Sequence, residues 1–156
     1  MAARKKHYIY SRSGIGKKPK LELPEKIDTH IVHSDPEIKK VQGIWPDSKE
    51  EYWVALALWK LHLDFVFQYQ LWGGRKYKGG QVVDFWIYTH PLPTPLLVQG
   101  WYWHYATAEQ TARTKTNLMY LESRLNGRAM KPVEIITKDI PTPEDTYMLV
   151  KKKLRA

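Results

Sequence analysis

The pattern of hydrophobic residues changes its period several times after residue 47, and the first regular stretch is helical. Val54 and Leu58 recur at the spacing of one helix face. Ser48 and Glu51 precede them at the positions of a capping box, in which a hydroxyl and a carboxylate satisfy free N–H groups of the first turn. The sequence therefore predicts an amphipathic helix over residues 49–62.

Three strand patterns follow this helix. They are FVFQY (65–69), QVVDFWIY (81–88) and PLLVQG (95–100). A Gly-bounded turn, LWGGRKYKGG, separates the first two, and the short Pro-rich connection THPLPT separates the second from the third. Three consecutive strands with short connections predict an antiparallel meander.

The rest of the chain predicts two more helices around one strand. Thr107 and Gln110 form a second capping-box pattern, and the helix after them is expected to end near Asn126, before Gly127. VEIIT (133–137) predicts a fourth strand. A final helix begins with Thr142-Pro143-Glu144-Asp145 and ends in KKKLRA. Because a helix connects the third and fourth strands, the fourth is expected to run parallel to a neighbour, which predicts an α/β fold with a small mixed sheet flanked by helices.

The first 47 residues have a different character. MAARKKHYIYSRSGIGKKPK carries seven basic residues and no acid, a composition that does not bury enough apolar surface to fold alone. We expect a basic N-terminal arm and extended segment over 1–47 and a core domain over 48–156. The arm has two interpretations: a solubilising tail, or a segment that becomes ordered on phosphates or on a partner protein.

The charge balance points to a polyanionic partner. The chain has a formal net charge of +9, with seven Trp and ten Tyr residues that suit stacking on bases as well as core packing. No stretch approaches the roughly 18 apolar residues of a membrane span, and no signal peptide pattern follows the basic N-terminus. The absence of cysteine excludes disulfides and thiolate metal sites. We expect a soluble protein, cytoplasmic or associated with nucleic acid, with DNA as its partner and no membrane association.

Two residues on the predicted strands are candidates for binding a divalent metal ion. Asp84 lies among apolar residues in the second strand, where an ionised carboxylate is costly unless it is paired or bound to a metal. Gln99 ends the third strand, so a hairpin would bring the two side chains together and offer Mg²⁺ one charged and one neutral oxygen ligand. An alternative for Asp84 is an ion pair with a nearby Lys or Arg.

Two further residues are candidates for acid–base chemistry. His104 ends a Trp-Tyr-Trp-His cluster, and a neutral imidazole there is suited to accept a proton from an attacking water. The alternative is a half-exposed histidine packed on Trp101 or Trp103. Glu51 is explained by its capping box alone, or it reaches the Asp84 site from the first helix.

Basic residues in three places are candidates for contacts with DNA phosphates. They lie in the arm, in the Gly-bounded turn and near the start of the second long helix: Arg4, Lys5, Lys6, Arg75, Lys76, Lys78, Arg113 and Lys115. A solvated, exposed tip is the alternative for the turn.

The order helix, three strands, helix, strand resembles the restriction-endonuclease-like αβββαβ core of the PD-(D/E)XK nucleases. More closely, Glu51, then GGQVVDF with Asp84, then VQGWYWH with His104 are similar to the very-short-patch repair endonucleases and related phage homing endonucleases. The resemblance covers roughly residues 48–154. It implies that Asp84 is the main metal ligand, Gln99 the variable ligand, His104 the general base and Glu51 a supporting acid.

The chain departs from the pattern of that family at two points. The segment TARTKTNLMYL (111–121) contains no acid where the family has its last aspartate. Gln99-Gly100-Trp101 stands in place of the E-x-K of the wider superfamily, and Lys115 is a candidate to replace its lysine.

Two hypotheses for function follow. The first is a DNA endonuclease that depends on Mg²⁺ or Mn²⁺. The second is a catalytically inactive module with the nuclease fold, which binds nucleic acid or builds a larger phage or ribonucleoprotein assembly, with the arm contacting protein.

Overall fold

The structure is a computed structural model, and it describes residues 35–155 of the 156-residue chain. The basic arm, including Arg4, Lys5 and Lys6, lies outside the described residues. The regular elements are α3 (Lys49–Lys60), β1 (Phe65–Leu71), β2 (Gln81–Ile87), β3 (Thr94–Gln99), α4 (Trp101–His104), α5 (Ala108–Arg124), β4 (Val133–Ile136), the 3₁₀ turn η2 (Thr137–Asp139) and α6 (Pro143–Leu154).

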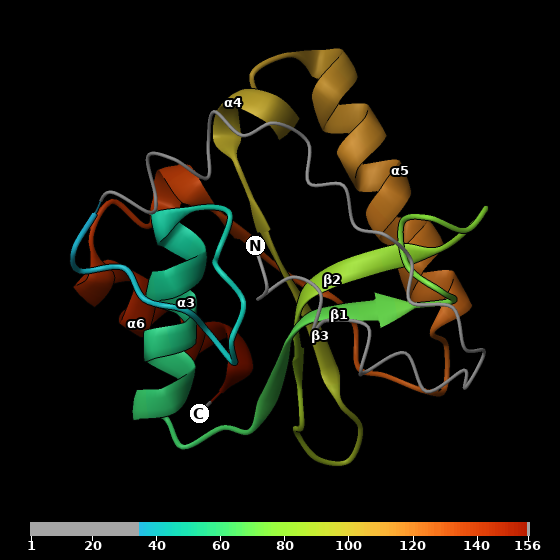
Figure 1. The fold of residues 1–156 in the computed structure, drawn as a ribbon. Coiled ribbons are helices and arrows are strands. Elements are labelled where there is room, and N and C mark those ends of the chain that lie inside the picture. Colours follow the sequence, from blue (N-terminus) through green and yellow to red (C-terminus); the bar gives the residue numbers. More distant parts are fainter. Residues whose placement is uncertain (1–34, 156) are drawn as a thin grey trace.

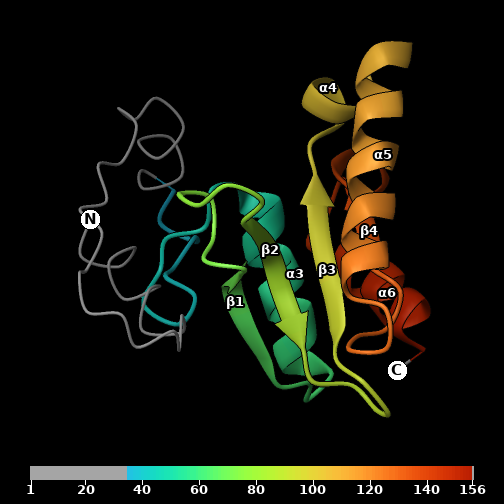
Figure 2. The ribbon, with the colours of Figure 1, turned by 90° about the vertical axis from the view of Figure 1, so that its right-hand side faces the viewer.

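The four strands form one mixed sheet in the order β1-β2-β3-β4. The first three are antiparallel, and β4 runs parallel to β3 after the α5 crossover. Figure 1 shows α3 and α6 on one face of the sheet and α5 on the other, and Figure 2 shows the same layers from the side. The predicted α/β class, with a small mixed sheet and flanking helices, is confirmed.

The helix boundaries follow from local capping. Ser48 accepts a hydrogen bond from the Glu51 N–H at 3.2 Å, and Thr107 and Gln110 form both bonds of a capping box. The reciprocal bond predicted for Glu51 is different: its carboxylate accepts from the N–H of Asp47 at 3.0 Å, one residue before the N-cap. Thr142 caps α6 in the same manner as Ser48 caps α3.

The segment 35–47 packs with the core, although the sequence placed it in the extended N-terminal region. Ile38, Val41 and Ile44 are buried in the same cluster as the inner residues of α3. Gln42 binds the outer edge of β1 with its amide: Nε2 donates to the Phe65 carbonyl at 2.6 Å, and Oε1 accepts from the Phe67 N–H at 2.8 Å. The side chain thus occupies part of the edge that another strand would otherwise pair with.

The odd-numbered residues of β1 and β2 change sides of the sheet near the middle of the strands. Phe67 and Phe85 pack toward α3 and α6, whereas Leu71 and Val83 pack toward α5. The change falls at Gln68, which has a left-handed φ of 55° and interrupts the regular alternation of the strand. The register continues on both sides of this point, which leaves Gln68 opposite Asp84.

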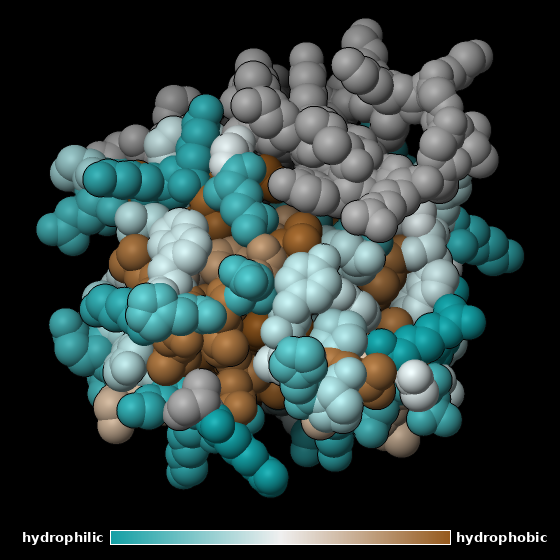
Figure 3. Space-filling view, turned by 90° about the horizontal axis from the view of Figure 1, so that it is seen from below, coloured by the Kyte–Doolittle hydropathy of each residue, from teal (hydrophilic) through white to brown (hydrophobic). Residues whose placement is uncertain are grey.

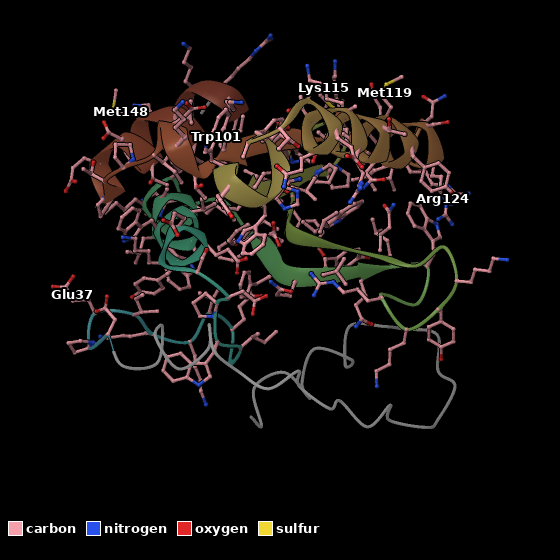
Figure 4. The ribbon with its side chains drawn as sticks, turned by 90° about the horizontal axis from the view of Figure 1, so that it is seen from above. Glu37, Trp101, Lys115, Met119, Arg124 and Met148 are labelled. Carbon is pink, nitrogen blue, oxygen red and sulfur yellow. The ribbon has the colours of Figure 1, made fainter. Side chains whose placement is uncertain are left out.

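The loop between β1 and β2 is fastened to α5. Arg124 donates to the carbonyl of Gly79, and its guanidinium lies 3.5 Å from the ring centroid of Trp72. Within the loop, Gly80 approaches Gly74 so closely that a Cβ on Gly80 would lie 1.8 Å from the Gly74 carbonyl oxygen. The loop is therefore a compact turn whose position relative to α5 is fixed, and Figure 4 shows Arg124 directed toward it.

The end of the molecule opposite α4 has a different surface. Apolar side chains gather there in the middle of the face, with hydrophilic side chains around them (Figure 3). In the described part of the chain, no helix combines the length and the apolar character that crossing a bilayer requires.

Candidate functional site

Polar side chains from successive elements lie near the junction of β3 and α4. Four of them were predicted from the sequence: Glu51 on α3, Asp84 on β2, Gln99 on β3 and His104 on α4. Gln68 on β1 joins them because the register places it opposite Asp84. The strands therefore bring residues that are far apart in sequence toward the junction of β3 and α4, which lies at the top of Figure 1.

Asp84 marks the point where β2 and β3 stop pairing. The last pair is Phe85 with Leu96, and beyond it the Asp84 Oδ2 accepts the Val98 N–H at 2.7 Å. The carboxylate thus replaces the backbone acceptor that a continuing strand would have supplied. Within the described chain, Asp84 has no ion pair and no hydrogen bond reaches its other oxygen, Oδ1.

Burial changes the acidity of this carboxyl. Desolvation raises the pKa of Asp84 to about 6, against the opposing effects of the Val98 N–H and the positive charge of Arg75. At neutral pH the group is mostly ionised but held in an unfavourable environment. An unfavourably buried carboxylate with one unpaired oxygen is suited to bind a cation or to exchange a proton.

Gln99 lies on the α5 side of the sheet. Its side chain lines a hollow of about 290 Å³, here called the basic hollow, together with Arg75, His104, Thr114 and Asn117. Gln99 is buried, yet its amide has no hydrogen bond within residues 35–155. The amide is therefore available to a ligand that enters the basic hollow.

Glu51 lies on the other face. It lines a second hollow of about 660 Å³, here called the acidic hollow, whose other carboxylates are Asp35, Asp47 and Glu50. β3 separates the two hollows because Val98 lines the acidic one and Gln99 the basic one. Glu51 and Gln99 are therefore not brought together on one face.

Glu51 reaches the centre of the sheet through Gln68. Its Oε2 accepts from the Gln68 Nε2 at 3.5 Å, a long contact between two buried side chains. Gln68 was not identified from the sequence. The pattern FVFQYQL shows a glutamine among aromatic residues, but only the register with β2 places it opposite Asp84.

His104 lines both hollows and so lies at their common rim. Burial lowers its pKa, and the negative charge of Glu134 opposes that effect. Its Nδ1 lies 3.3 Å from the Oγ1 of Thr114 on α5. The histidine is thus a neutral imidazole near pH 7, and its ring contacts Thr114 of α5.

An acid that the sequence analysis overlooked lies on β4. Glu134 accepts a hydrogen bond from the Tyr105 hydroxyl, and burial together with this carboxylate raises the pKa of Tyr105. Its position in β4, opposite Leu97 of β3, places it beside the α4 turn that carries His104. Glu134 was not predicted because it lies on β4 and not on the helix after the histidine.

The predicted phosphate contacts differ in their surroundings. Arg75 lines the basic hollow, and Lys76 and Lys78 are exposed in the same loop. Arg113 forms a surface ion pair with Glu109 at 3.1 Å, which offsets its charge. Lys115 points away from the sheet (Figure 4), so it does not reach toward Asp84 in place of the E-x-K lysine.

Exposed aromatic side chains border the site. Trp101, Tyr102 and Trp103 on α4 are exposed, and the Lys138 Nζ lies 4.3 Å from the ring centroid of Trp101. The His104 ring contacts the Thr114 hydroxyl, and Trp101 and Trp103 line the acidic hollow together with His104.

The carboxylates near the site are dispersed. Among residues 35–155, no group of three or more His, Asp or Glu side chains is arranged to hold a metal ion. Comparison with known proteins adds no assignment, since the chain matches no protein-family model, no curated protein and no solved structure.

Proposed function

We propose that this protein is a divalent-metal-dependent endonuclease with a restriction-endonuclease-like core, and that its substrate is DNA. The observation that carries the proposal is Asp84, a partly buried carboxylate with one unpaired oxygen at the point where two central strands separate. The element order and the mixed sheet between helices support the fold assignment.

Asp84 and Gln99 are the residues that would hold a magnesium or manganese ion together with the substrate. Mg²⁺ usually takes one or two carboxylates and completes its coordination with waters and substrate phosphates. Asp84 Oδ1 supplies one charged oxygen and Gln99 one neutral oxygen. Because Asp84 is the single acid in this pair and no cluster of three or more His, Asp or Glu side chains lies in the described chain, the ion would bind weakly before DNA arrives. When bound, it supplies positive charge that stabilises the phosphate during hydrolysis and lowers the pKa of water.

Other residues of the chain would bind the phosphates and transfer the proton. Arg75 at the rim of the basic hollow would bind a phosphate oxygen and orient the backbone. His104, neutral near pH 7, would take a proton from the attacking water. Lys76 and Lys78, exposed in the same loop, would contact neighbouring phosphates.

A cleavage assay tests this proposal. Purified full-length protein is incubated with supercoiled, linear and branched DNA in the presence of Mg²⁺ or Mn²⁺. We expect nicking or cutting that Asp84→Asn and His104→Ala each reduce by at least about 10²-fold, the lower range for a general base. Lys151→Ala, which alters an exposed residue on α6, is the matched control and is expected to leave cleavage unchanged. Absence of cleavage by the wild type on every substrate contradicts the proposal.

A second candidate is a module of the same fold that binds DNA without cutting it. The dispersed carboxylates and the neutral Gln99 favour it. Calorimetry with Mn²⁺ separates the two, because the endonuclease should bind Mn²⁺ more tightly in the presence of DNA and lose this enhancement in Asp84→Asn. DNA binding with no dependence on Mn²⁺ or on Asp84 would favour the inactive module.

A further inference from the structure

Thr114 differs from the other threonines on the same helix in what its hydroxyl bonds. Thr111 and Thr116 donate to the carbonyls of Thr107 and Ala112, each four residues earlier, at 2.9 Å. This back-bonding is the usual behaviour of threonine inside a helix. The Thr114 hydroxyl instead leaves its own helix and lies against His104.

The hydroxyl contacts His104 at two atoms. Thr114 Oγ1 lies 3.2 Å from the His104 carbonyl oxygen and 3.3 Å from its Nδ1. A hydroxyl has one proton to donate and lone pairs to accept with. The carbonyl oxygen is only an acceptor, so the Thr114 proton is directed to it. The oxygen of Thr114 is then left to accept from the ring.

This arrangement decides which ring nitrogen carries the proton. Two acceptors facing each other at 3.3 Å would repel, so the neutral imidazole places its proton on Nδ1. Nε2 then carries the lone pair. Because Thr114 is buried and fixed by the helix, water does not readily replace this contact.

We propose that Thr114 is a positioning residue that holds His104 in the Nδ1–H tautomer and leaves Nε2 as the base that accepts the proton of the attacking water. The proposal rests on the endonuclease function, and it assigns to a neutral hydroxyl the orienting contact for which the segment 111–121 has no acid. Glu134, close to His104 from β4, then supplies the negative charge that stabilises the imidazolium once it forms.

Nitrogen NMR of the histidine ring tests the tautomer without any cleavage assay. In the wild type above the pKa of His104, we expect the Nδ1-protonated form. Thr114→Val keeps the shape of the side chain and removes the hydroxyl, so it should shift His104 toward the Nε2–H form. Thr114→Ser should retain the wild-type signature. Thr116→Val is the matched control, since it removes a hydroxyl from the same helix away from His104, and it should change nothing.

Cleavage rates give the second readout. Thr114→Val should lower kcat by about 10-fold to 10²-fold, less than the full contribution of a general base, and Thr114→Ser should restore most of it. A wild-type His104 protonated on Nε2, or a tautomer unchanged by Thr114→Val, would overturn the assignment of Thr114. If the tautomer is as stated and no DNA is cut, the endonuclease function and with it the catalytic role of Thr114 fail, whereas the structural assignment of the tautomer stands.

Discussion

At the scale of single residues, Asp84 combines a structural and a chemical role in the same carboxyl group. Oδ2 accepts the backbone N–H of Val98, which β2 no longer pairs, and Oδ1 remains unpaired within the described chain. Removal of the whole carboxyl therefore removes both the acceptor of the Val98 N–H and the negative charge. Asparagine distinguishes these two roles, because its carbonyl oxygen can still accept from the Val98 N–H while the side chain carries no charge.

We therefore expect Asp84→Asn and Asp84→Ala to differ in stability, although the proposed function predicts that neither cleaves DNA. Asp84→Ala leaves the Val98 N–H without an acceptor, which costs about 1–3 kcal/mol. Asp84→Asn keeps that bond and removes a poorly solvated charge, so its free energy of unfolding should equal or exceed that of the wild type at pH 7. Urea denaturation of the three proteins measures this. Equal destabilisation by both changes would contradict the structural role.

The pH dependence of stability follows from the same group. The folded pKa of Asp84, about 6, lies above its ordinary value of 3.8, so the folded state holds this proton more tightly than the unfolded chain. The corresponding stabilisation is complete below pH 3.8 and is lost as the pH rises through about 6. The advantage of Asp84→Asn over the wild type should therefore be larger at pH 8 than at pH 5. Denaturation curves at both pH values check the sign, and a constant difference would exclude the raised pKa.

At the scale of secondary structure elements, the edge of β1 depends on a side chain from outside the sheet. The Gln42 amide bonds both the Phe65 carbonyl and the Phe67 N–H. At the other edge of the sheet, Lys153 donates to the Glu134 carbonyl at 2.7 Å. Both outer strands thus have backbone groups covered by polar side chains, which limits pairing with another chain.

Two glutamines provide a matched test of this arrangement. Gln42→Met removes both edge bonds with little change in length and should lower the free energy of unfolding by about 1–3 kcal/mol. Gln70 on the same strand has a buried Oε1 without a partner among the described residues, so Gln70→Met should be neutral or stabilising. Chemical denaturation measures both, and equal losses from the two changes would argue against the edge-covering role.

Much of the secondary structure could be predicted from the sequence, because the helix starts depend on interactions between residues close together in the chain. The starts of α3, α5 and α6 were predicted because a threonine or serine caps each helix through bonds within one turn. The parallel orientation of β4 followed from its helical crossover. The helix α4 was not predicted because four residues, Trp101–His104, are too short to show a period.

The parts that the sequence did not reveal depend on long-range pairing. Gln68 adopts a left-handed conformation that is uncommon outside glycine, and its position opposite Asp84 requires the register of two strands. Gln42 lies more than twenty residues from the strand edge that it covers. Glu134 approaches His104 only because β4 lies next to β3. Asp84, Gln99 and His104 were identified because each is an unusual polar residue in an apolar context.

At the scale of the whole molecule, the two hollows have opposite charge and lie on opposite faces of β3. Arg75 borders the hollow on the α5 side, and four carboxylates together with one lysine, Lys49, border the other. A polyanion is therefore favoured on the α5 side, where the β1–β2 loop and the helix lie side by side.

Salt dependence of DNA binding tests this orientation. Arg75→Ala should weaken binding and reduce the slope of log K against log salt concentration by about 0.9, the value for one lost phosphate contact with duplex DNA. Lys151→Ala on α6 removes an equal charge from a distant exposed position and should leave the slope unchanged. Fluorescence anisotropy between low and moderate salt gives both slopes. Identical effects of the two changes would mean that binding depends on net charge alone.

The attachment of the β1–β2 loop by Arg124 has a consequence for how quickly a partner is recognised. Stacking on Trp72 and the bond to Gly79 anchor both ends of the turn to a rigid helix. The position of Arg75, Lys76 and Lys78 in this loop relative to α5 is therefore set during folding, before any partner binds. A partner that docks on this surface would therefore cost the loop little conformational freedom.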